Sequence, residues 1–168
     1  RLLRRHGIPV DILCVVHDRN VREPLALYRF FREIRARYVS FIPLVEPEPG
    51  AAGGVSARSV PAEAFGAFLC TVFDAWVRQD IGRVIVQIFE EAQRPLLGQD
   101  HSLCIFRETC GDVPVVEHDG GFYACDHFVT PDHRLGTIRE RPLRALLESP
   151  AQRAFGLAKR DALPRTCR

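Results

Sequence analysis

The sequence predicts an α/β fold in two parts, and two patterns in the residues carry this prediction. Residues 9–17 and 38–45 are β-branched, apolar runs on either side of a segment with helical spacing, the pattern of a βα unit from a parallel sheet or barrel. Residues 104–125 hold three of the six cysteines and an Asp-Gly-Gly turn between two β-prone runs. We therefore expect a parallel α/β part up to residue 94, followed over residues 95–168 by a cysteine-rich α+β part with a β-hairpin.

The first βα unit is predicted from residues 9 to 45. Residues 9–17 are an almost unbroken apolar run, as is typical of a strand buried on both faces of a parallel sheet. Residues 23–38 place apolar side chains at helical spacing with arginines on the opposite side, and Pro24 suits the first turn. A second strand is expected over residues 38–45, before a proline-rich segment.

The strongest helical pattern runs from about Ser59 to Asp80. Ser59 is the predicted N-cap and Gly82 the predicted stop signal. We interpret the aromatic stripe of this helix as part of the core, because apolar residues at this spacing normally face a core. A third strand is expected over residues 83–89, and a short helix over residues 142–155. The stripe consists of Phe65, Phe68, Leu69, Val72, Phe73 and Trp76.

Composition excludes several classes of protein. The net charge is +2 with both signs interspersed, which gives no electrostatic case for nucleic-acid binding. No run of about 18 apolar residues is present, so no transmembrane helix is expected. Six cysteines in 168 residues are too sparse for a disulfide scaffold, and Cys14 and Cys70 are interpreted as small buried hydrophobes. We expect a monomeric, cytoplasmic protein with no nucleic-acid or membrane partner.

The cysteine-rich stretch predicts a metal or iron–sulfur site. The Asp119-Gly120-Gly121 turn would fold Cys125 back beside Cys110, with Cys104 close by, because glycine reaches the positive φ angles that such turns need. Three thiolates held together by backbone are the beginning of such a site, although three are too few to close one.

These residues carry a resemblance to a known family. The spacing of Cys110, Gly120 and Cys125 resembles the start of the SPASM domain, a cluster-binding extension of many peptide-modifying radical S-adenosylmethionine enzymes. With Cys104 and the run Tyr-Ala-Cys-Asp-His-Phe-Val at 123–129, the chain resembles the anaerobic sulfatase-maturating enzymes in particular. The resemblance implies that residues 1–94 are the C-terminal part of a partial (β/α)6 radical SAM barrel. Residues 95–168 would be the N-terminal part of the SPASM auxiliary-cluster domain.

The resemblance also implies an activity and cofactors. In that family, S-adenosylmethionine bound to a [4Fe–4S] cluster yields a 5′-deoxyadenosyl radical. The radical takes a hydrogen from Cβ of a serine or cysteine in an unfolded sulfatase segment, and the product is formylglycine. Asp126 occupies the position of the base that accepts the substrate proton, which a carboxylate can do. The alternative is that Asp126 has a purely structural role, as a turn-capping residue at the edge of the hairpin.

The ligand residues follow from the same resemblance. Cys104, Cys110 and Cys125 would ligate the first auxiliary [4Fe–4S] cluster, and Cys167 would be the first ligand of the second. Contacts to S-adenosylmethionine are expected from the first two strands, at Ile12, Leu13, Val15 and Phe41.

The sequence contains no methionine and no Cys-x-x-x-Cys-x-x-Cys motif for the catalytic cluster. We therefore expect an internal fragment of a larger enzyme, inactive on its own. Two alternatives stay open. One is another SPASM enzyme that forms thioethers or oxidises peptides. The other is a non-catalytic zinc module that uses the three cysteines of residues 104–125 together with His118 or His127.

Overall fold

The computed structural model describes residues 2–50 and 54–163. The chain divides into two compact units, Arg1–Leu97 and Gly98–Arg168, which are described separately. Among the described residues, no helix is both long and apolar enough to cross a membrane.

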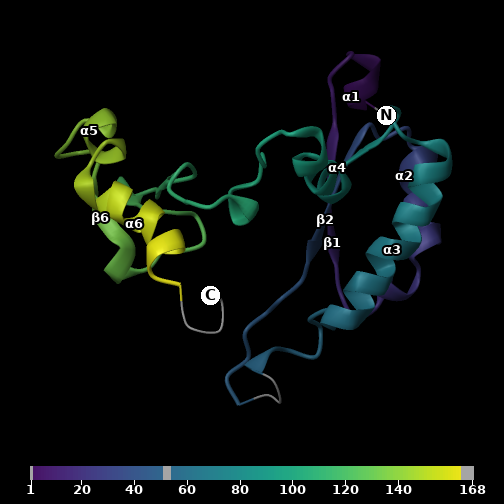
Figure 1. Cartoon of the computed structure of the whole chain (residues 1–168), viewed down its shortest axis with the longest axis horizontal. Helices are drawn as coiled ribbons and strands as arrows, with labels where there is room; N and C mark the ends of the chain where they lie inside the picture. The colour runs from purple at the N-terminus through teal and green to yellow at the C-terminus, as the bar shows by residue number, and fades with distance from the viewer. Residues whose placement is uncertain (1, 51–53, 164–168) are drawn as a thin grey trace. The chain divides into compact units, whose positions relative to one another are not determined.

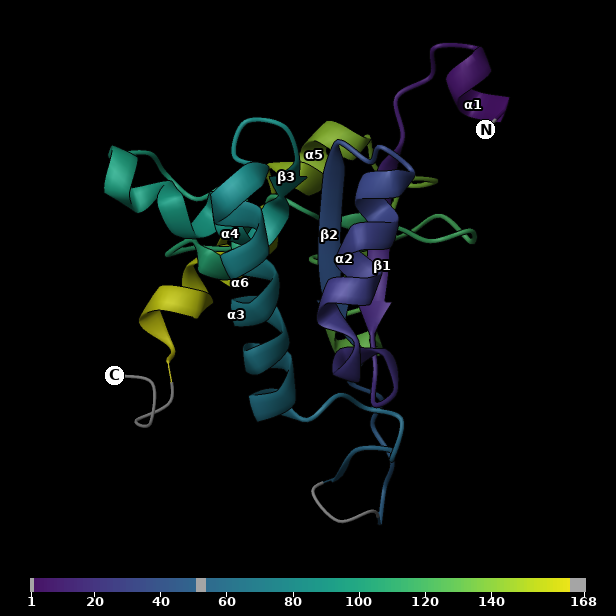
Figure 2. The same cartoon turned by 90° about the vertical axis from the view of Figure 1, so that its right-hand side faces the viewer.

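Unit 1 is built on a three-stranded parallel sheet in the order β1-β2-β3. Its helices α2 and α3 lie on the same side of the strands, as Figures 1 and 2 show. The elements are α1 (Leu2–Arg5), β1 (Asp11–Val16), η1 (Asn20–Arg22), α2 (Pro24–Glu33), β2 (Tyr38–Pro43), α3 (Ala62–Gln79), β3 (Ile85–Val86), α4 (Gln87–Gln93) and η3 (Pro95–Leu97). The predicted β1-α2-β2 unit is thus confirmed.

Most of the aromatic stripe of α3 faces the core, as predicted, whereas Phe73 is 40% exposed. Phe68, Val72 and Trp76 are each at most 1% exposed, and the Trp76 indole N–H donates a 2.7 Å hydrogen bond to the Val84 carbonyl. The predicted N-cap at Ser59 is wrong, because α3 begins at Ala62 after Pro61. The Ser59 hydroxyl instead accepts a hydrogen bond from the Glu46 amide at 2.9 Å.

The third predicted strand is also wrong beyond its first half. The chain pairs with β2 only at Ile85 and Val86 and then turns into α4. The reason is packing: the Phe89 ring lies 5.3 Å from Trp76 and 5.2 Å from Phe73, measured between ring centroids. A helix buries this phenylalanine against α3, which a further strand could not do.

A buried polar group joins α2 to the end of α3. The Asp80 side chain is 5% exposed; it accepts a 2.9 Å hydrogen bond from the Tyr28 hydroxyl and pairs with Arg32 at 3.1 Å. Burial and this hydrogen bond both raise the pKa of Tyr28. The carboxylate therefore has the partners that a buried charge needs.

The two cysteines of unit 1 differ in environment. Cys14 is half-buried in β1, where burial raises its pKa, and it packs against the core. Cys70 on α3 is exposed, so its predicted burial is wrong. It lies two residues from both Phe68 and Val72, which are buried, and helix positions two residues apart do not share a face.

Unit 2 combines a three-stranded antiparallel sheet with two helices. The predicted hairpin is confirmed: Val115 pairs with Tyr123 and Val116 with Phe122, across a turn in which Gly120 has φ +83°. A third strand, β6, was not expected. The elements are η4 (Cys104–Phe106), β4 (Val115–Val116), β5 (Gly121–Tyr123), η5 (Pro131–His133), β6 (Arg134–Thr137), α5 (Leu143–Leu147) and α6 (Pro150–Asp161).

The single helix predicted for residues 142–155 is two helices in the structure. Helix α5 ends at Leu147, and α6 begins at Pro150, which takes the first helical position. The Ser149 hydroxyl caps α6 by accepting a 3.2 Å hydrogen bond from the Gln152 amide. A break at Ser149-Pro150 is therefore built into the sequence, and α6 continues six residues past the predicted end.

Candidate metal centre

Three potential ligands lie next to each other just after β5. The Cys125 thiol is 3.3 Å from Asp126 Oδ1 and 3.8 Å from His127 Nδ1, and the last two atoms are 3.0 Å apart. One ligand atom from each residue lies within 4.8 Å of the others, which is close enough for a shared metal ion. This position corresponds to the Cys-Asp-His run that the sequence singled out.

The surroundings of Cys125 raise the pKa of its thiol. Burial is the largest cause that raises its pKa, and the hydrogen bond to Asp126 and the charges of Asp126 and Cys104 add to it. The backbone N–H of His127 opposes the shift. A metal or cluster would have to displace the thiol proton, as metal binding to thiols generally does.

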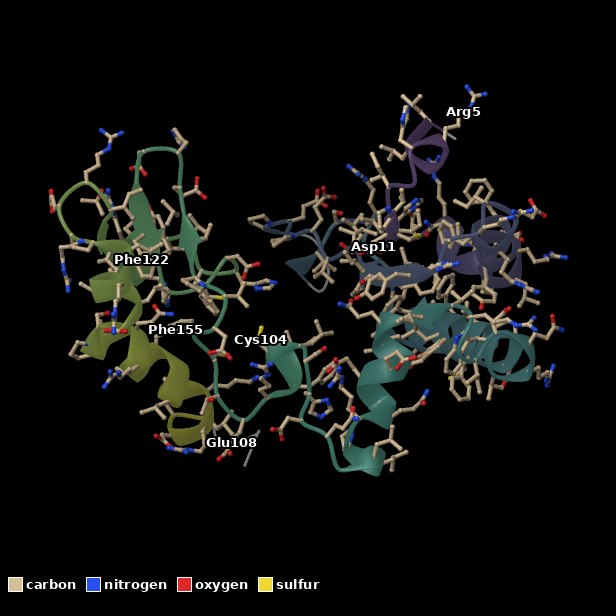
Figure 3. All side chains as sticks on the ribbon, turned by 90° about the horizontal axis from the view of Figure 1, so that it is seen from above. Arg5, Asp11, Cys104, Glu108, Phe122 and Phe155 are labelled. Carbon is tan, nitrogen blue, oxygen red and sulfur yellow. The ribbon has the colours of Figure 1, made fainter. Side chains whose placement is uncertain are left out.

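Helix α6 contacts the backbone beside Cys104, Cys110 and Cys125. Lys159 donates to the Cys104 carbonyl at 2.6 Å, and the Cys110 amide donates to the Gly156 carbonyl at 3.0 Å. All three cysteines are half-buried free thiols. Figure 3 labels Cys104 on its loop and Phe155 on α6. The segments that carry the three predicted ligands thus all contact α6, whereas Cys167 lies outside the described residues.

The thiols of Cys104, Cys110 and Cys125 are suitable ligands for an iron–sulfur cluster. Soft thiolates are the usual ligands of such clusters. The Asp126 side chain is 51% exposed within unit 2. Among the zinc alternatives, His118 is 94% exposed and pairs with Glu117, so His127 is the better placed histidine.

The four residues expected near S-adenosylmethionine do not share one face of the sheet. Leu13 and Val15 are 70% and 46% exposed on the face away from α2 and α3. Ile12 and Phe41 lie on the opposite face, packed in the core, because side chains alternate along a strand. A ligand on the open face could contact the side chains of Leu13 and Val15. The expected contacts of Ile12 and Phe41 with S-adenosylmethionine stay a prediction.

Sequence reasoning missed the residues of α6 that contact the cysteine segments. The available signals were the Ser149-Pro150 helix start and the fact that Lys159 is the only lysine in the sequence. Neither signal indicates which backbone groups the helix would contact.

Comparison with known families identifies the cysteine-rich part. The family model described as "SPASM: Iron-sulfur cluster-binding domain" matches residues 104–168. Residues 104–168 are therefore similar to SPASM domains. All the described cysteines of unit 2 lie within the matched SPASM domain.

The chain as a whole is similar to curated sulfatase-maturating enzymes. It is 36% identical to the serine-type anaerobic sulfatase-maturating enzyme of Bacteroides thetaiotaomicron, over 99% of this chain and 44% of that protein. It is 32% identical to the serine-type enzyme of Klebsiella pneumoniae, over 99% of this chain and 41% of that protein. It is 29% identical to the cysteine-type enzyme of Clostridium perfringens, over 92% and 42% respectively. The chain spans less than half the length of these relatives, and the predicted resemblance is confirmed.

Solved structures support the same relationship. The structure of native anSMEcpe with bound AdoMet matches with a TM-score of 0.84 at 28% identity, over 99% of this chain and 45% of that one. The same protein with bound AdoMet and Cp18Cys peptide also gives a TM-score of 0.84. An α/β fold followed by a SPASM domain is therefore confirmed.

Proposed function

We propose that this chain is part of an anaerobic sulfatase-maturating enzyme that oxidises a serine or cysteine of a sulfatase to formylglycine. The observation that carries the proposal is the placement of Asp126 directly beside the Cys125 thiol within a SPASM domain. Similarity to serine-type and cysteine-type enzymes along more than nine-tenths of the chain supports it. Because the chain spans less than half of these relatives, the activity is proposed for the longer protein.

Unit 1 would be the C-terminal part of a (β/α)6 barrel that binds S-adenosylmethionine. Helices α2 and α3 cover one face of its sheet, and exposed apolar side chains lie on the other, at Leu13, Val15, Ile42 and Ile85. In a closed barrel this second face would line the interior. Leu13 and Val15 are therefore our candidates for side-chain contact with S-adenosylmethionine, supported from the core side by Ile12 and Phe41.

Unit 2 would hold the auxiliary iron–sulfur clusters. Cys104, Cys110 and Cys125 would ligate the first [4Fe–4S] cluster, and Cys167 would contribute to the second. When bound, the clusters and S-adenosylmethionine would supply the one-electron chemistry that removes hydrogen and electrons from the substrate residue.

Asp126 would act as the base in this reaction. Converting a hydroxyl or thiol to an aldehyde requires a group that accepts the side-chain proton. The Asp126 carboxylate is half exposed, so a peptide could reach it, and it contacts Cys125, a proposed cluster ligand. The substrate would be an unfolded sulfatase segment. We expect the enzyme to act as a cytoplasmic monomer.

The direct test uses the longer protein, reconstituted with iron and sulfide without oxygen. It is incubated with S-adenosylmethionine, a reductant and a sulfatase-motif peptide, and the peptide is weighed by mass spectrometry. We expect a serine peptide to lose two hydrogens, and a cysteine peptide to exchange sulfur for oxygen and also lose two hydrogens. Asp126→Asn should abolish the product, whereas Asp132→Asn, a change to an exposed carboxylate in the same segment, should not.

Two results would contradict the proposal in different ways. Release of 5′-deoxyadenosine with an unmodified peptide would indicate another SPASM enzyme with a different peptide substrate. A colourless protein that contains zinc and gives neither product would favour the zinc module, for which the closeness of Cys125 and His127 is the supporting observation. Iron–sulfur clusters absorb visible light, so colour separates the two metals.

A further inference from the structure

One face of α6 contacts the backbone beside all three cysteines of unit 2. Gln152, Gly156 and Lys159 are four and three residues apart, so they follow one another along the same side of the helix. We call these three residues the α6 face. The SPASM match does not assign a role to any of them.

Gln152 connects the segments of Cys110 and Cys125. Its Nε2 donates hydrogen bonds to the Gly111 carbonyl at 2.8 Å and to the Ala124 carbonyl at 3.0 Å. Gly111 directly follows Cys110, and Ala124 directly precedes Cys125. One buried nitrogen therefore holds the backbone beside two cysteines at a fixed separation. The residue is 4% exposed.

The orientation of this amide comes at a cost in free energy. Gln152 Oε1 is buried and has no hydrogen-bond partner among the described residues. A buried, unpaired acceptor destabilises a fold. The side chain nevertheless points its amino group toward the carbonyls of Gly111 and Ala124. This orientation indicates that the role of Gln152 is to hold these two carbonyls in place.

Gly156 allows the closest approach. Its carbonyl accepts the 3.0 Å hydrogen bond from the Cys110 amide, and a Cβ at this position would overlap the Cys110 carbonyl oxygen. Only glycine lets the Cys110 backbone lie directly on the helix.

Lys159 holds the backbone at Cys104. Its Nζ donates to the Cys104 carbonyl at 2.6 Å and to the Ile105 carbonyl at 2.9 Å. These carbonyls belong to η4, so the ammonium fixes the turn that carries the cysteine. It also brings a positive charge next to that residue.

We propose that the α6 face positions Cys104, Cys110 and Cys125 for cluster binding, with Gln152 and Lys159 as positioning residues. The proposal rests on the cluster ligation proposed above. Gln152 sets the separation of the Cys110 and Cys125 segments, and Lys159 sets the place of Cys104. The charge of Lys159 also favours the reduced state of the cluster, because nearby positive charge stabilises added electrons.

The first test measures cluster loading of the longer protein after anaerobic reconstitution with iron and sulfide. Gln152→Glu keeps the size of the side chain but turns a carboxylate oxygen toward two carbonyl oxygens. We expect a loss of up to about four iron atoms per chain, the content of one [4Fe–4S] cluster, or an altered electron paramagnetic resonance spectrum. Cys110→Ala marks the full loss, and Arg153→Gln on the exposed side of α6 is the control that should load normally.

The second test concerns Lys159 and does not depend on iron loading being lost. Lys159→Gln should lower the reduction potential of the cluster, and Lys159→Arg, which keeps the charge, should restore it. Arg153→Gln removes the same charge from the same helix and should leave the potential unchanged. A purely structural role for Lys159 would not produce this dependence on charge.

The outcomes separate this inference from the proposed function. Wild-type protein that binds no iron through Cys104, Cys110 and Cys125 would overturn the proposed function and the inference with it. Wild-type protein that loads normally, with Gln152→Glu equal to Arg153→Gln in iron content and spectrum, would overturn the inference alone. Circular dichroism checks folding. Should Gln152→Glu not fold, an unchanged potential in Lys159→Gln would overturn the inference.

Discussion

Nδ1 of His127 lies 3.0 Å from Oδ1 of Asp126. Since Asp126 also contacts the Cys125 thiol, these two neighbours together orient its carboxylate. We predict that His127→Gln slows formylglycine formation about tenfold, the usual effect of losing a group that orients a site residue. Asp126→Asn should cost at least about 100-fold, because the base itself is lost. Rates are measured with a sulfatase-motif peptide, and equal rates for His127→Gln and wild type would show that His127 has no orienting role.

The hydrogen bond between Tyr28 and Asp80 should contribute measurably to stability. Tyr28→Phe removes the donor and leaves the buried carboxylate to Arg32 alone. We predict a loss of about 1–3 kcal/mol in the free energy of unfolding. Urea denaturation followed by the fluorescence of Trp76, the only tryptophan, measures it. Arg29→Ala on the exposed side of α2 is the control and should change stability little.

The same tyrosine predicts how stability depends on alkaline pH. The folded state raises the pKa of Tyr28 above its ordinary value of 10.0, so folding favours the protonated hydroxyl. Its contribution is fully present below about pH 10 and is lost as pH rises through the folded-state pKa. Unfolding experiments between about pH 8 and 11 should show a decline that is smaller in Tyr28→Phe. Identical slopes in the two proteins would rule out Tyr28 as its source.

The end of α2 offers a stabilising substitution. Arg35 has φ 52°, its amide donates to the Arg32 carbonyl, and the Ala36 amide donates to the Phe31 carbonyl. This is a Schellman motif with arginine where glycine is preferred. Arg35→Gly should raise the free energy of unfolding by about 0.5–1 kcal/mol, since relief of strain exceeds the entropy that glycine adds to the unfolded chain. Arg37→Gly, which removes the same charge without relieving strain, should instead destabilise.

The two cysteines of unit 1 should differ in reactivity. Burial raises the pKa of Cys14, and the thiolate is the reactive form, whereas Cys70 is exposed on α3. In native protein, iodoacetamide should therefore modify Cys70 faster than Cys14, as peptide mapping would show. The difference should vanish in denaturant. Equal rates in the native protein would contradict the burial of Cys14.

Local sequence patterns correctly predicted the elements whose structure depends mainly on residues within the element itself. The apolar runs gave β1 and β2, and the Asp-Gly-Gly turn gave the hairpin. The predicted strand over residues 83–89 ends already at Val86, because Phe89 packs against Trp76, a contact that no local pattern contains. Ser59 was a sound N-cap signal, but the Glu46 amide engages its hydroxyl.

The candidate site was predictable only in part. Cysteine spacing and family resemblance indicated the ligands and Asp126. The roles of Gln152 and Lys159 depend on hydrogen bonds from side chains to backbone carbonyls 28 to 55 residues away in sequence. Any side chain with a donor could make such bonds, so the sequence carries no signature of them.

The capped start of α6 has a consequence for which insertions and deletions the chain can accept. Ser149 and Pro150 fix where the helix begins, so the number of residues from that cap determines the direction of each side chain. One residue inserted between 152 and 159 would rotate Lys159 by about 100° around the helix axis. The number of residues from Ser149 to Lys159 is thus fixed by the contacts of α6 with the cysteine segments. By contrast, length changes in the segment before Cys104 would leave these contacts intact.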